Sequence, residues 1–257
     1  MNETLSFWPK GIKGAVSLTF DDALESQLTN AIPLLHKHNL KGTFYVNPDF
    51  RTTWQEQLPR WQQASRLGHE IGNHTTRHPC SCNFGFSPDY CLENLQLGDI
   101  EATIDAAEKA LNEFFPEQEG RRSFCYPCYQ SYVGAGIYRQ SYVPLVARRF
   151  SVARGGGERA NNPRLIDLSY VWAWAVEGRS GEDIIDFIEK AIDQEAWAII
   201  CMHGIDDQHL AIDLNAFSKL VLHLGKNKGR IWTDTVLNLA DYILSQRQKT
   251  MGDLHGA

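Results

Sequence analysis

Two neighbouring acidic residues, Asp21 and Asp22, directly follow an apolar stretch of the sequence, residues 15–20. Two carboxylates at one site repel each other, and a bound divalent metal relieves this repulsion by taking one of them as a ligand. The alternative is a helix N-cap, because Asp is favoured before a helix and residues 24–38 have helical spacing. The pair therefore indicates either metal-assisted chemistry or helix capping.

Three histidines follow two other predicted strands. His74 and His78 come after residues 70–73, and His203 comes after residues 196–202. If residues 75–78 form one helical turn, His74 and His78 project from one face and can reach a single ion. A carboxylate with two histidines leaves positions open for water and substrate. A lone His203 is more often a structural residue, but its place at a strand end near the other groups favours catalysis.

The hydrophobic pattern predicts a scaffold that would bring these strand ends together. Short apolar runs alternate with amphipathic ones, which predicts strands at 15–20, 42–46, 70–73, 122–126, 151–153, 165–171 and 196–202. Helical spacing covers 24–38, 54–67, 88–115, 136–149, 182–194, 215–224 and 235–247. This alternation favours an α/β fold, a distorted (β/α) barrel of about seven parallel strands, with active-site residues at the carboxyl ends of the strands.

The chain has 257 residues, of which 43% are hydrophobic, so a single domain can bury a large core without disulfides. We expect an N-terminal strap over residues 1–14, one barrel over 15–249 and a flexible tail over 250–257. The six cysteines are expected to be reduced thiols. Cys125 and Cys128 form a C-x-x-C, but no second half-site for a structural zinc accompanies it.

Charge and hydropathy exclude several classes of partner. The formal net charge of −6 argues against nucleic acid, since that affinity comes largely from Lys and Arg. No stretch approaches the roughly 20 apolar residues that span a bilayer, and the first 14 residues lack the apolar run of a signal peptide. We expect no membrane partner and a cytoplasmic location for the chain as given, or secretion if a signal has been removed. The oligomeric state stays open.

Three short motifs resemble those of a known family. Thr19-Phe20-Asp21-Asp22, His74-Thr-Thr-Arg-His78 and Cys201-Met202-His203 are similar to the first, second and fifth motifs of the polysaccharide deacetylases, carbohydrate esterase family 4 with its NodB-homology domain. The resemblance implies that Asp22, His74 and His78 ligate a divalent metal, that Asp21 is the catalytic base and that His203 is the catalytic acid. It also implies a distorted barrel.

The third motif of that family reads Arg-x-Pro-Tyr, whereas residues 124–129 here read FCYPCY and lack the arginine. In the family this arginine orients the catalytic aspartate. We expect Arg154, after the predicted strand 151–153, to replace it, with an ordinary surface arginine as the alternative. By motif position, the N–H of Cys128 would donate to the oxyanion.

The fourth motif, an Asp-rich segment ending in Trp, is matched loosely by residues 167–174. Trp174 could line the acetyl pocket, and Tyr126 is among the aromatic residues that could stack on a sugar. No Asp precedes Trp174, so the acid that should polarise His203 is unassigned, with Asp167 and Asp206 as candidates. Cys201 stands where the family has a leucine facing the acyl methyl.

The expected function is removal of an N-acetyl group from an N-acetylated sugar or oligosaccharide by attack of a metal-bound water. Zinc is the first expectation for the one divalent metal ion, with cobalt, manganese and iron as alternatives. A hydrolase of small cyclic amides or ureides is the second hypothesis. A catalytically inactive carbohydrate-binding relative is the third, because the motif-three arginine is missing.

Overall fold

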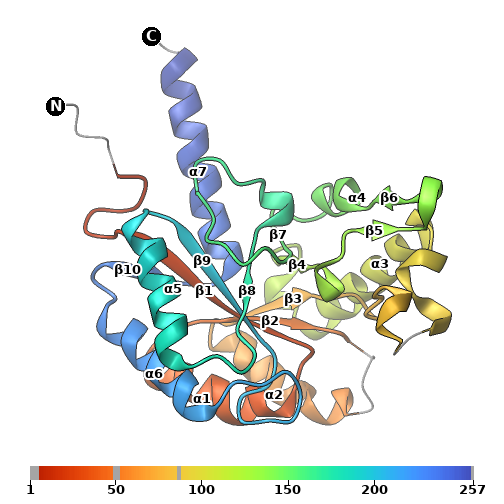
Figure 1. Ribbon diagram of the computed structural model, residues 1–257, viewed down its shortest axis with the longest axis horizontal. Coiled ribbons are helices and arrows are strands. Elements are labelled where there is room, and N and C mark those ends of the chain that lie inside the picture. Colours follow the sequence, from red (N-terminus) through yellow and green to blue (C-terminus); the bar gives the residue numbers. More distant parts are fainter. Residues whose placement is uncertain (1–5, 49–52, 86–87, 256–257) are drawn as a thin grey trace.

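A parallel β-sheet forms the centre of the structure, a computed structural model that describes residues 6–48, 53–85 and 88–255 (Figure 1). The central strand, β1 (Gly14–Asp21), is buried along its whole length. On one side it pairs with β9 (Trp197–Met202). Two strands share its other edge. The first half of β1 pairs with β10 (Ile231–Thr233), and its last residues pair with β2 (Thr43–Val46).

The sheet continues beyond β2 and β9 in both directions. Strands β3 (Glu70–Asn73), β4 (Phe124–Cys125) and β7 (Ala153–Arg154) follow β2, and β8 (Trp174–Ala175) follows β9; every pairing is parallel. A parallel bridge between Arg154 and Val171 connects β7 to the segment that leads into β8. The sheet therefore curls, and the expected fold, a distorted (β/α) barrel in a single domain, is confirmed.

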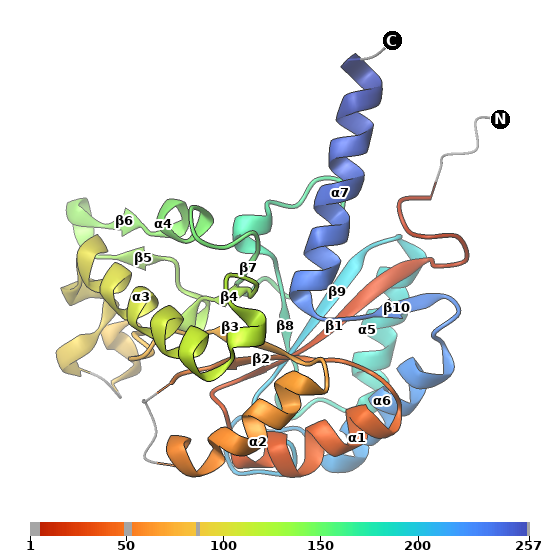
Figure 2. The same cartoon turned by 180° about the vertical axis from the view of Figure 1, so that it is seen from behind.

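Helices cover the outside of this sheet, except for the last helix, which packs against Ala15, Trp197 and Ile199 on the other face (Figures 1 and 2). They are α1 (Ile32–Lys37) with the preceding π-helical turn Gln27–Ala31, α2 (Trp54–Arg66), α3 (Leu97–Phe114), α4 (Val143–Ala147), α5 (Gly181–Asp193), α6 (Leu214–Lys226) and α7 (Val236–His255). Short 3-10 turns lie at Cys82–Phe84, Pro88–Tyr90, Leu92–Asn94, Pro116–Gln118, Pro127–Tyr129, Gly136–Tyr138 and Leu168–Tyr170. No helix in the described part of the chain is long and apolar enough to cross a membrane.

Alternation along β1 explains both the core and the position of the polar residues. Val16, Leu18 and Phe20 belong to the apolar cluster beneath the helices, and Phe20 stacks on Phe44 of β2 with ring centroids 4.7 Å apart. Because successive side chains point to opposite faces of a strand, the intervening residues face the barrel interior. Asp21, the last residue of β1, lies on this interior face and is buried.

Two predicted elements are wrong. Residues 165–171 form no strand, because the side chain of Asp167 accepts a hydrogen bond from the N–H of Ser169 and caps a 3-10 turn there. The helix expected at 136–149 is limited to α4, because Pro144 fits only the first turn of a helix. Two strands instead form a hairpin that the pattern did not predict, β5 (Tyr132–Val133) and β6 (Gln140–Ser141).

The N-terminal segment packs against α7, the last helix of the chain. Phe7 and Trp8 are buried, and the Trp8 ring stacks on Tyr242 of α7 at 5.8 Å between centroids. Helix α7 continues to His255, so the backbone of residues 250–255 is helical where we expected a flexible tail. The expected boundaries of the N-terminal strap and of the barrel domain stay predictions.

Candidate active site

The side chains of Asp22, His74 and His78 converge just after the carboxyl ends of β1 and β3. Nε2 of His74 lies 3.7 Å from Oδ1 of Asp22, and Nε2 of His78 lies 3.5 Å from the same oxygen. Two ligands that are each about 2.1 Å from one ion at a tetrahedral angle lie roughly 3.4 Å apart. The three donor atoms therefore have a spacing that fits a divalent ion.

The segment from His74 to His78 is a loop and not the helical turn that we expected. Thr75 and His78 have φ angles of 62° and 44°, in the left-handed region. The N–H of His78 donates to Oγ1 of Thr75, and the N–H of Thr75 donates to Oδ1 of Asn73, both at 2.9 Å. Such side-chain bonds to the backbone compete with helix formation, which is why the prediction failed. The loop nevertheless places the two imidazole centroids 4.8 Å apart.

Both histidines are in the state that a metal ligand requires. Nδ1 of His74 lies 2.9 Å from the carbonyl oxygen of Cys125, which can only accept, so Nδ1 carries the hydrogen and Nε2 has a free lone pair. Burial, together with the neighbouring His78, lowers the pKa of His74 to about 4. Burial also lowers the pKa of His78. Neutral imidazoles at neutral pH can bind a cation without first releasing a proton.

Asp21 lies beside this ligand group and contacts the guanidinium of Arg154. Nη2 of Arg154 donates to both carboxylate oxygens of Asp21, and both side chains are buried. Burial alone would raise the pKa of Asp21, but the Arg154 charge lowers it below its ordinary value. The guanidinium lies between two aromatic rings, 5.1 Å from the centroid of Tyr45 and 5.5 Å from that of Tyr129. Asp21 is therefore a buried, ionised carboxylate.

Two thiols complete the surroundings of this ion pair. Sγ of Cys125 and Sγ of Cys201 lie 3.8 Å and 3.6 Å from Oδ2 of Asp21. Arg154 donates to both sulfur atoms, at 2.8 Å and 3.3 Å respectively. Burial raises the pKa of the Cys201 thiol to about 12 and that of Cys125 well above its ordinary value, so both are neutral. These thiols add no negative charge that would compete with Asp21 for the arginine.

His203 follows β9 and reaches the same site. Its Nε2 lies 3.9 Å from Oδ2 of Asp21, and its ring meets that of His209 edge-on at 5.8 Å between centroids. Neither candidate for the orienting acid contacts it: within the described ranges, Asp21 is the only carboxylate that forms an ion pair with His203. Asp167 instead caps the 3-10 turn that begins at Leu168.

Residues 9–133 match a family model described as Polysaccharide deacetylase. This part of the chain belongs to the polysaccharide deacetylase family. The resemblance that we drew from the three motifs is confirmed. A search of curated proteins by sequence found no match.

Solved structures of polysaccharide deacetylase relatives share the fold across most of the chain. A candidate polysaccharide deacetylase from Mycobacterium smegmatis is 16% identical, with a TM-score of 0.65 and 93% of each chain covered. A family 4 acetyl xylan esterase from Clostridium thermocellum, solved with a cobalt ion, is 19% identical, with a TM-score of 0.55 and 88% and 89% of the two chains covered. A mutant of a CE4-family pseudoenzyme is 17% identical, with a TM-score of 0.55 and 90% and 68% covered.

The third motif lacks its arginine here, but Arg154 on the neighbouring strand contacts Asp21 in its place. Arg-x-Pro places the arginine two residues before the proline, a position that Cys125 occupies before Pro127. Cys125 and Arg154 are directly paired Cα partners of the neighbouring strands β4 and β7. Arg154 is fully buried, so the surface alternative is wrong. The guanidinium reaches Asp21 from the next strand, past a side chain small enough to leave room.

Two residues that we expected to contact substrate are directed away from this site. Trp174 is the partner of Ile200 in the β8–β9 ladder, and its ring packs on Phe187 of α5 at 4.7 Å. It therefore lies on the helix-covered face, while its neighbour Ala175 is the partner of Cys201. Tyr126 is fully buried, and its hydroxyl donates to the carbonyl oxygen of Ser169.

The expectation of six reduced thiols is wrong for four of them. Disulfides join Cys80 to Cys128 and Cys82 to Cys91, with Cα atoms 5.7 Å and 4.9 Å apart. A large core makes disulfides unnecessary for the barrel, but three of these cysteines lie in the region between β3 and α3, whose described parts contain short 3-10 turns and no longer helix or strand. Cys128 is bonded to Cys80 and not to its C-x-x-C partner, and Cys125 and Cys201 are free and buried.

Sequence reasoning missed three polar residues that hold or approach the site. Nε2 of Gln27 donates to the carbonyl oxygens of Asp21 and His203, at 2.6 Å and 3.1 Å, and so joins the ends of β1 and β9. Nδ2 of Asn47 donates to the carbonyl oxygen of His74. Nε2 of His209 lies 3.6 Å from Oδ2 of Asp22. Asn47 could have been predicted, because continuing the period-two alternation of β2 places its side chain on the interior face. No comparable pattern in the sequence pointed to Gln27 or His209.

Proposed function

We propose that this chain is a metal-dependent deacetylase that removes the N-acetyl group from an N-acetylated sugar or oligosaccharide. The observation that carries the proposal is the convergence of Asp22, His74 and His78 beside the buried carboxylate of Asp21. A polysaccharide is the substrate class that the family description supports.

The residues of the chain divide the reaction between them. Asp22, His74 and His78 would hold the ion, which supplies an activated water and polarises the carbonyl of the substrate when it is bound. Asp21 takes the proton of the attacking water, while Arg154 holds its carboxylate in place. The reaction then develops negative charge on the carbonyl oxygen and breaks the bond to the amine.

Two groups act at this second stage. The N–H of Cys128 has no acceptor among the described residues, so it is available to donate to the carbonyl oxygen. His203, in its protonated form, gives a proton to the departing amine. Oδ2 of Asp21 lies 3.9 Å from Nε2 of His203. The group that takes a proton from water and the group that gives a proton to the amine are therefore neighbours in the same site.

The two alternatives differ in what the same site would do. A small cyclic amide or ureide presents the same kind of carbonyl, so its hydrolysis would need the same residues. An inactive carbohydrate-binding relative would not need a buried ionised base. The Asp21–Arg154 pair favours an enzyme, because burying two charges is costly and serves no obvious purpose in sugar binding.

Acetate release from N-acetylglucosamine oligomers tests the proposal, with a ureide panel assayed in parallel. We expect acetate release that is lost on chelation and restored by zinc, cobalt or manganese. Full activity after verified metal removal would overturn the metal-dependent mechanism. Ureide turnover without acetate release would favour the cyclic-amide hydrolase, and saccharide binding without any turnover would favour the inactive relative.

Substitutions separate the base from the ligands. Asp21→Asn is expected to lower kcat by roughly 100-fold or more and to leave the metal content unchanged, because it removes the base alone. His74→Ala is expected to lose the metal. Asp186→Asn and His36→Ala, at exposed positions, serve as matched controls that should change neither property. If both site variants keep wild-type activity, the proposed site is misplaced.

A further inference from the structure

We propose that the disulfide between Cys80 and Cys128 is a positioning element of the metal site. It would hold the loop that carries His78 and the turn that carries the N–H of Cys128 as one rigid unit. This inference rests on the proposed function, because it concerns the same ligand and the same backbone donor.

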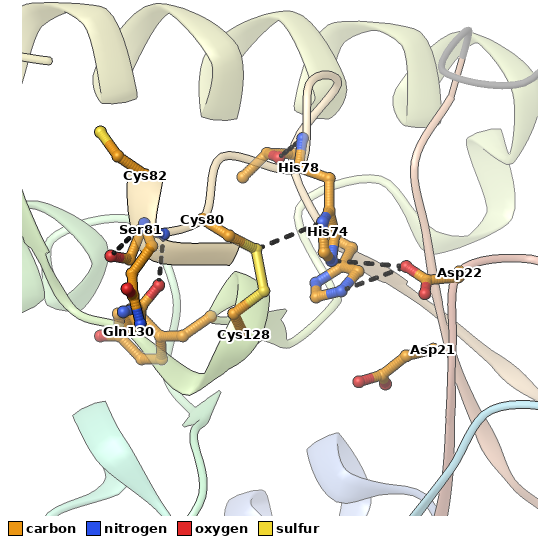
Figure 3. Close-up of a disulfide and its surroundings, with 12 residues drawn as sticks. Asp21, Asp22, His74, His78, Cys80, Ser81, Cys82, Cys128 and Gln130 are labelled. Carbon is orange, nitrogen blue, oxygen red and sulfur yellow. Dashed lines mark hydrogen bonds and ion pairs between the residues drawn. A yellow bond between two sulfur atoms is a disulfide. The ribbon is translucent and has the colours of Figure 1, made fainter. Parts of the chain in front are cut away.

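The disulfide joins two segments that are distant in sequence and adjacent at the site. Cys80 comes two residues after His78, Cys128 lies in the 3-10 turn after β4, and 48 residues separate the two cysteines. Figure 3 shows the disulfide on one side of the histidine pair and Asp22 on the other. A second link joins the same segments, because the N–H of Ser81 donates to Oε1 of Gln130 at 2.7 Å.

On the ligand side, the bonded sulfur contacts the imidazole of His78. Sγ of Cys80 lies 3.6 Å from Nδ1 of His78, while Nε2 of the same ring faces Oδ1 of Asp22 at 3.5 Å. A disulfide sulfur has no hydrogen to donate, so this contact favours the tautomer with its hydrogen on Nδ1, which leaves the lone pair of Nε2 for an ion. A reduced Cys80 thiol could donate instead, which would remove this restriction on the tautomer.

On the donor side, the disulfide holds a backbone conformation that is unfavourable for residues other than glycine. Cys128 and Tyr129 have φ angles of 50° and 59°, two successive residues in the left-handed region. Such a conformation is strained for residues with a side chain and persists only where the surroundings impose it. His78, at the other end of the link, also has a positive φ of 44°. The disulfide therefore connects two strained turns, each of which presents one functional group.

The second disulfide provides an internal comparison. Cys82 and Cys91 close a short loop, nine residues apart in sequence, and the side chain of Cys82 points away from the histidines in Figure 3. Glu93 accepts hydrogen bonds from the Ser81 hydroxyl and the Cys82 N–H and braces the same loop. This disulfide does not reach the turn after β4. Its removal should cost loop stability without altering the site directly.

The test compares two double variants of the full chain, Cys80→Ser/Cys128→Ser and Cys82→Ser/Cys91→Ser. Zinc affinity is measured by competition with a chelator, and kcat and KM are measured by acetate release. Loss of a group that orients a ligand typically weakens metal affinity 10–100-fold. We expect a loss of that size, with a lower kcat, for the first variant and a change below about 3-fold for the second. Equal zinc affinity and equal kcat in the two variants would overturn the inference.

A second measurement keeps the test decisive if the first variant does not fold. In the Cys82→Ser/Cys91→Ser variant, the disulfide between Cys80 and Cys128 is the one left to reduce, and a phosphine reductant breaks it without binding zinc strongly. Zinc affinity should fall on reduction and return on reoxidation, and an unchanged affinity after verified reduction would contradict the proposal. A wild-type protein that binds no divalent ion would instead defeat the proposed function itself.

Discussion

Arg154 shows how a buried residue on one strand can replace a motif residue on the next. Its guanidinium contacts both oxygens of Asp21, two thiols and the faces of two tyrosines. Cys125 occupies the motif position and is directly paired with Arg154 across β4 and β7. An arginine at position 125 would occupy the space that the Arg154 side chain fills. We therefore interpret the small Cys125 and the arginine at position 154 as one coupled change.

Replacing the arginine tests this arrangement. Arg154→Lys is expected to lower kcat by about 10-fold or more at unchanged metal content, because a single ammonium on a different stem cannot contact Asp21 and both thiols as the two guanidinium nitrogens do. Arg154→Met should also destabilise the fold, by roughly 3–5 kcal/mol, since it leaves the Asp21 charge buried and unpaired. Steady-state kinetics, metal analysis and denaturant unfolding measure these effects.

An exchanged pair supplies the control. The double variant Cys125→Arg/Arg154→Cys returns the guanidinium to the neighbouring strand and should recover part of the kcat that Arg154→Cys alone loses. Arg149, whose ion pairs with Glu101 and Asp105 lie at the surface, provides a matched variant, Arg149→Lys, with little expected effect. No recovery in the exchanged pair, together with an undiminished kcat in Arg154→Lys, would show that Asp21 needs no such partner.

At the scale of the strands, the alternation of side chains made part of the site predictable. Asp21 is the last residue of β1, and Cys201 and His203 lie two residues apart at the end of β9, so the period of two places them on one face. The strand ends and the three motifs were therefore readable from the sequence. The loop that carries His78 was not, because hydrogen bonds from Asn73 and Thr75 decide its conformation.

Other features depend on pairings between distant segments, which a single sequence does not contain. The contact between Arg154 and Asp21 follows from the register of β7 on β4. Trp174 faces the helices because it pairs with Ile200 of β9, whose side chain lies in the apolar cluster beneath the helices. The disulfide partners of Cys80 and Cys82 likewise follow from how an irregular loop folds.

A close contact between β2 and β3 tests the packing beneath the site. A Cβ added to Gly72 would lie 2.4 Å from the Tyr45 ring, and that ring packs against Arg154. Gly72→Ala is expected to destabilise the protein by about 1–3 kcal/mol in denaturant unfolding, because neither ring nor strand can move freely. Gly98→Ala, in α3 with open space around it, should be neutral or stabilising by about 1 kcal/mol. Equal effects of the two substitutions would contradict the packing described.

At the scale of the whole molecule, the barrel buries titratable groups at both ends. The Asp21–Arg154 pair lies at the carboxyl end of the strands, and Glu70 lies near the opposite end. Its carboxylate accepts hydrogen bonds from Thr43, Ser123 and the N–H of Leu237 at the start of α7. Helix α7 is thus attached to the barrel through a buried carboxylate as well as through apolar packing.

His69, next to Glu70, makes the stability depend on pH. Burial lowers its pKa from 6.5 to about 3, so the unfolded state takes up a proton below pH 6.5 that the folded state does not. The stability that neutral His69 contributes is present above pH 6.5 and is lost as the pH falls towards 3. At 1.36 kcal/mol per pKa unit, the loss between pH 7 and pH 5 is about 2 kcal/mol.

The variant His69→Gln isolates this contribution, because glutamine can still accept the hydrogen bond from the N–H of Gly42 and does not titrate. Its free energy of unfolding should fall by about 2 kcal/mol less than that of the wild type between pH 7 and pH 5. Denaturant unfolding at the two pH values measures this difference. Identical pH dependence in the two proteins would mean that His69 is not buried in its neutral form.

Titration of zinc into the chelator-treated protein tests the metal site most directly, with His74→Ala and the exposed-site variant His36→Ala measured alongside. We predict one tightly bound ion per chain for the wild type and for His36→Ala. We predict at least a 100-fold weaker affinity for His74→Ala, because the variant removes one of three protein ligands. No stoichiometric binding by the wild type, or equal affinity of wild type and His74→Ala, would contradict the metal site formed by Asp22, His74 and His78.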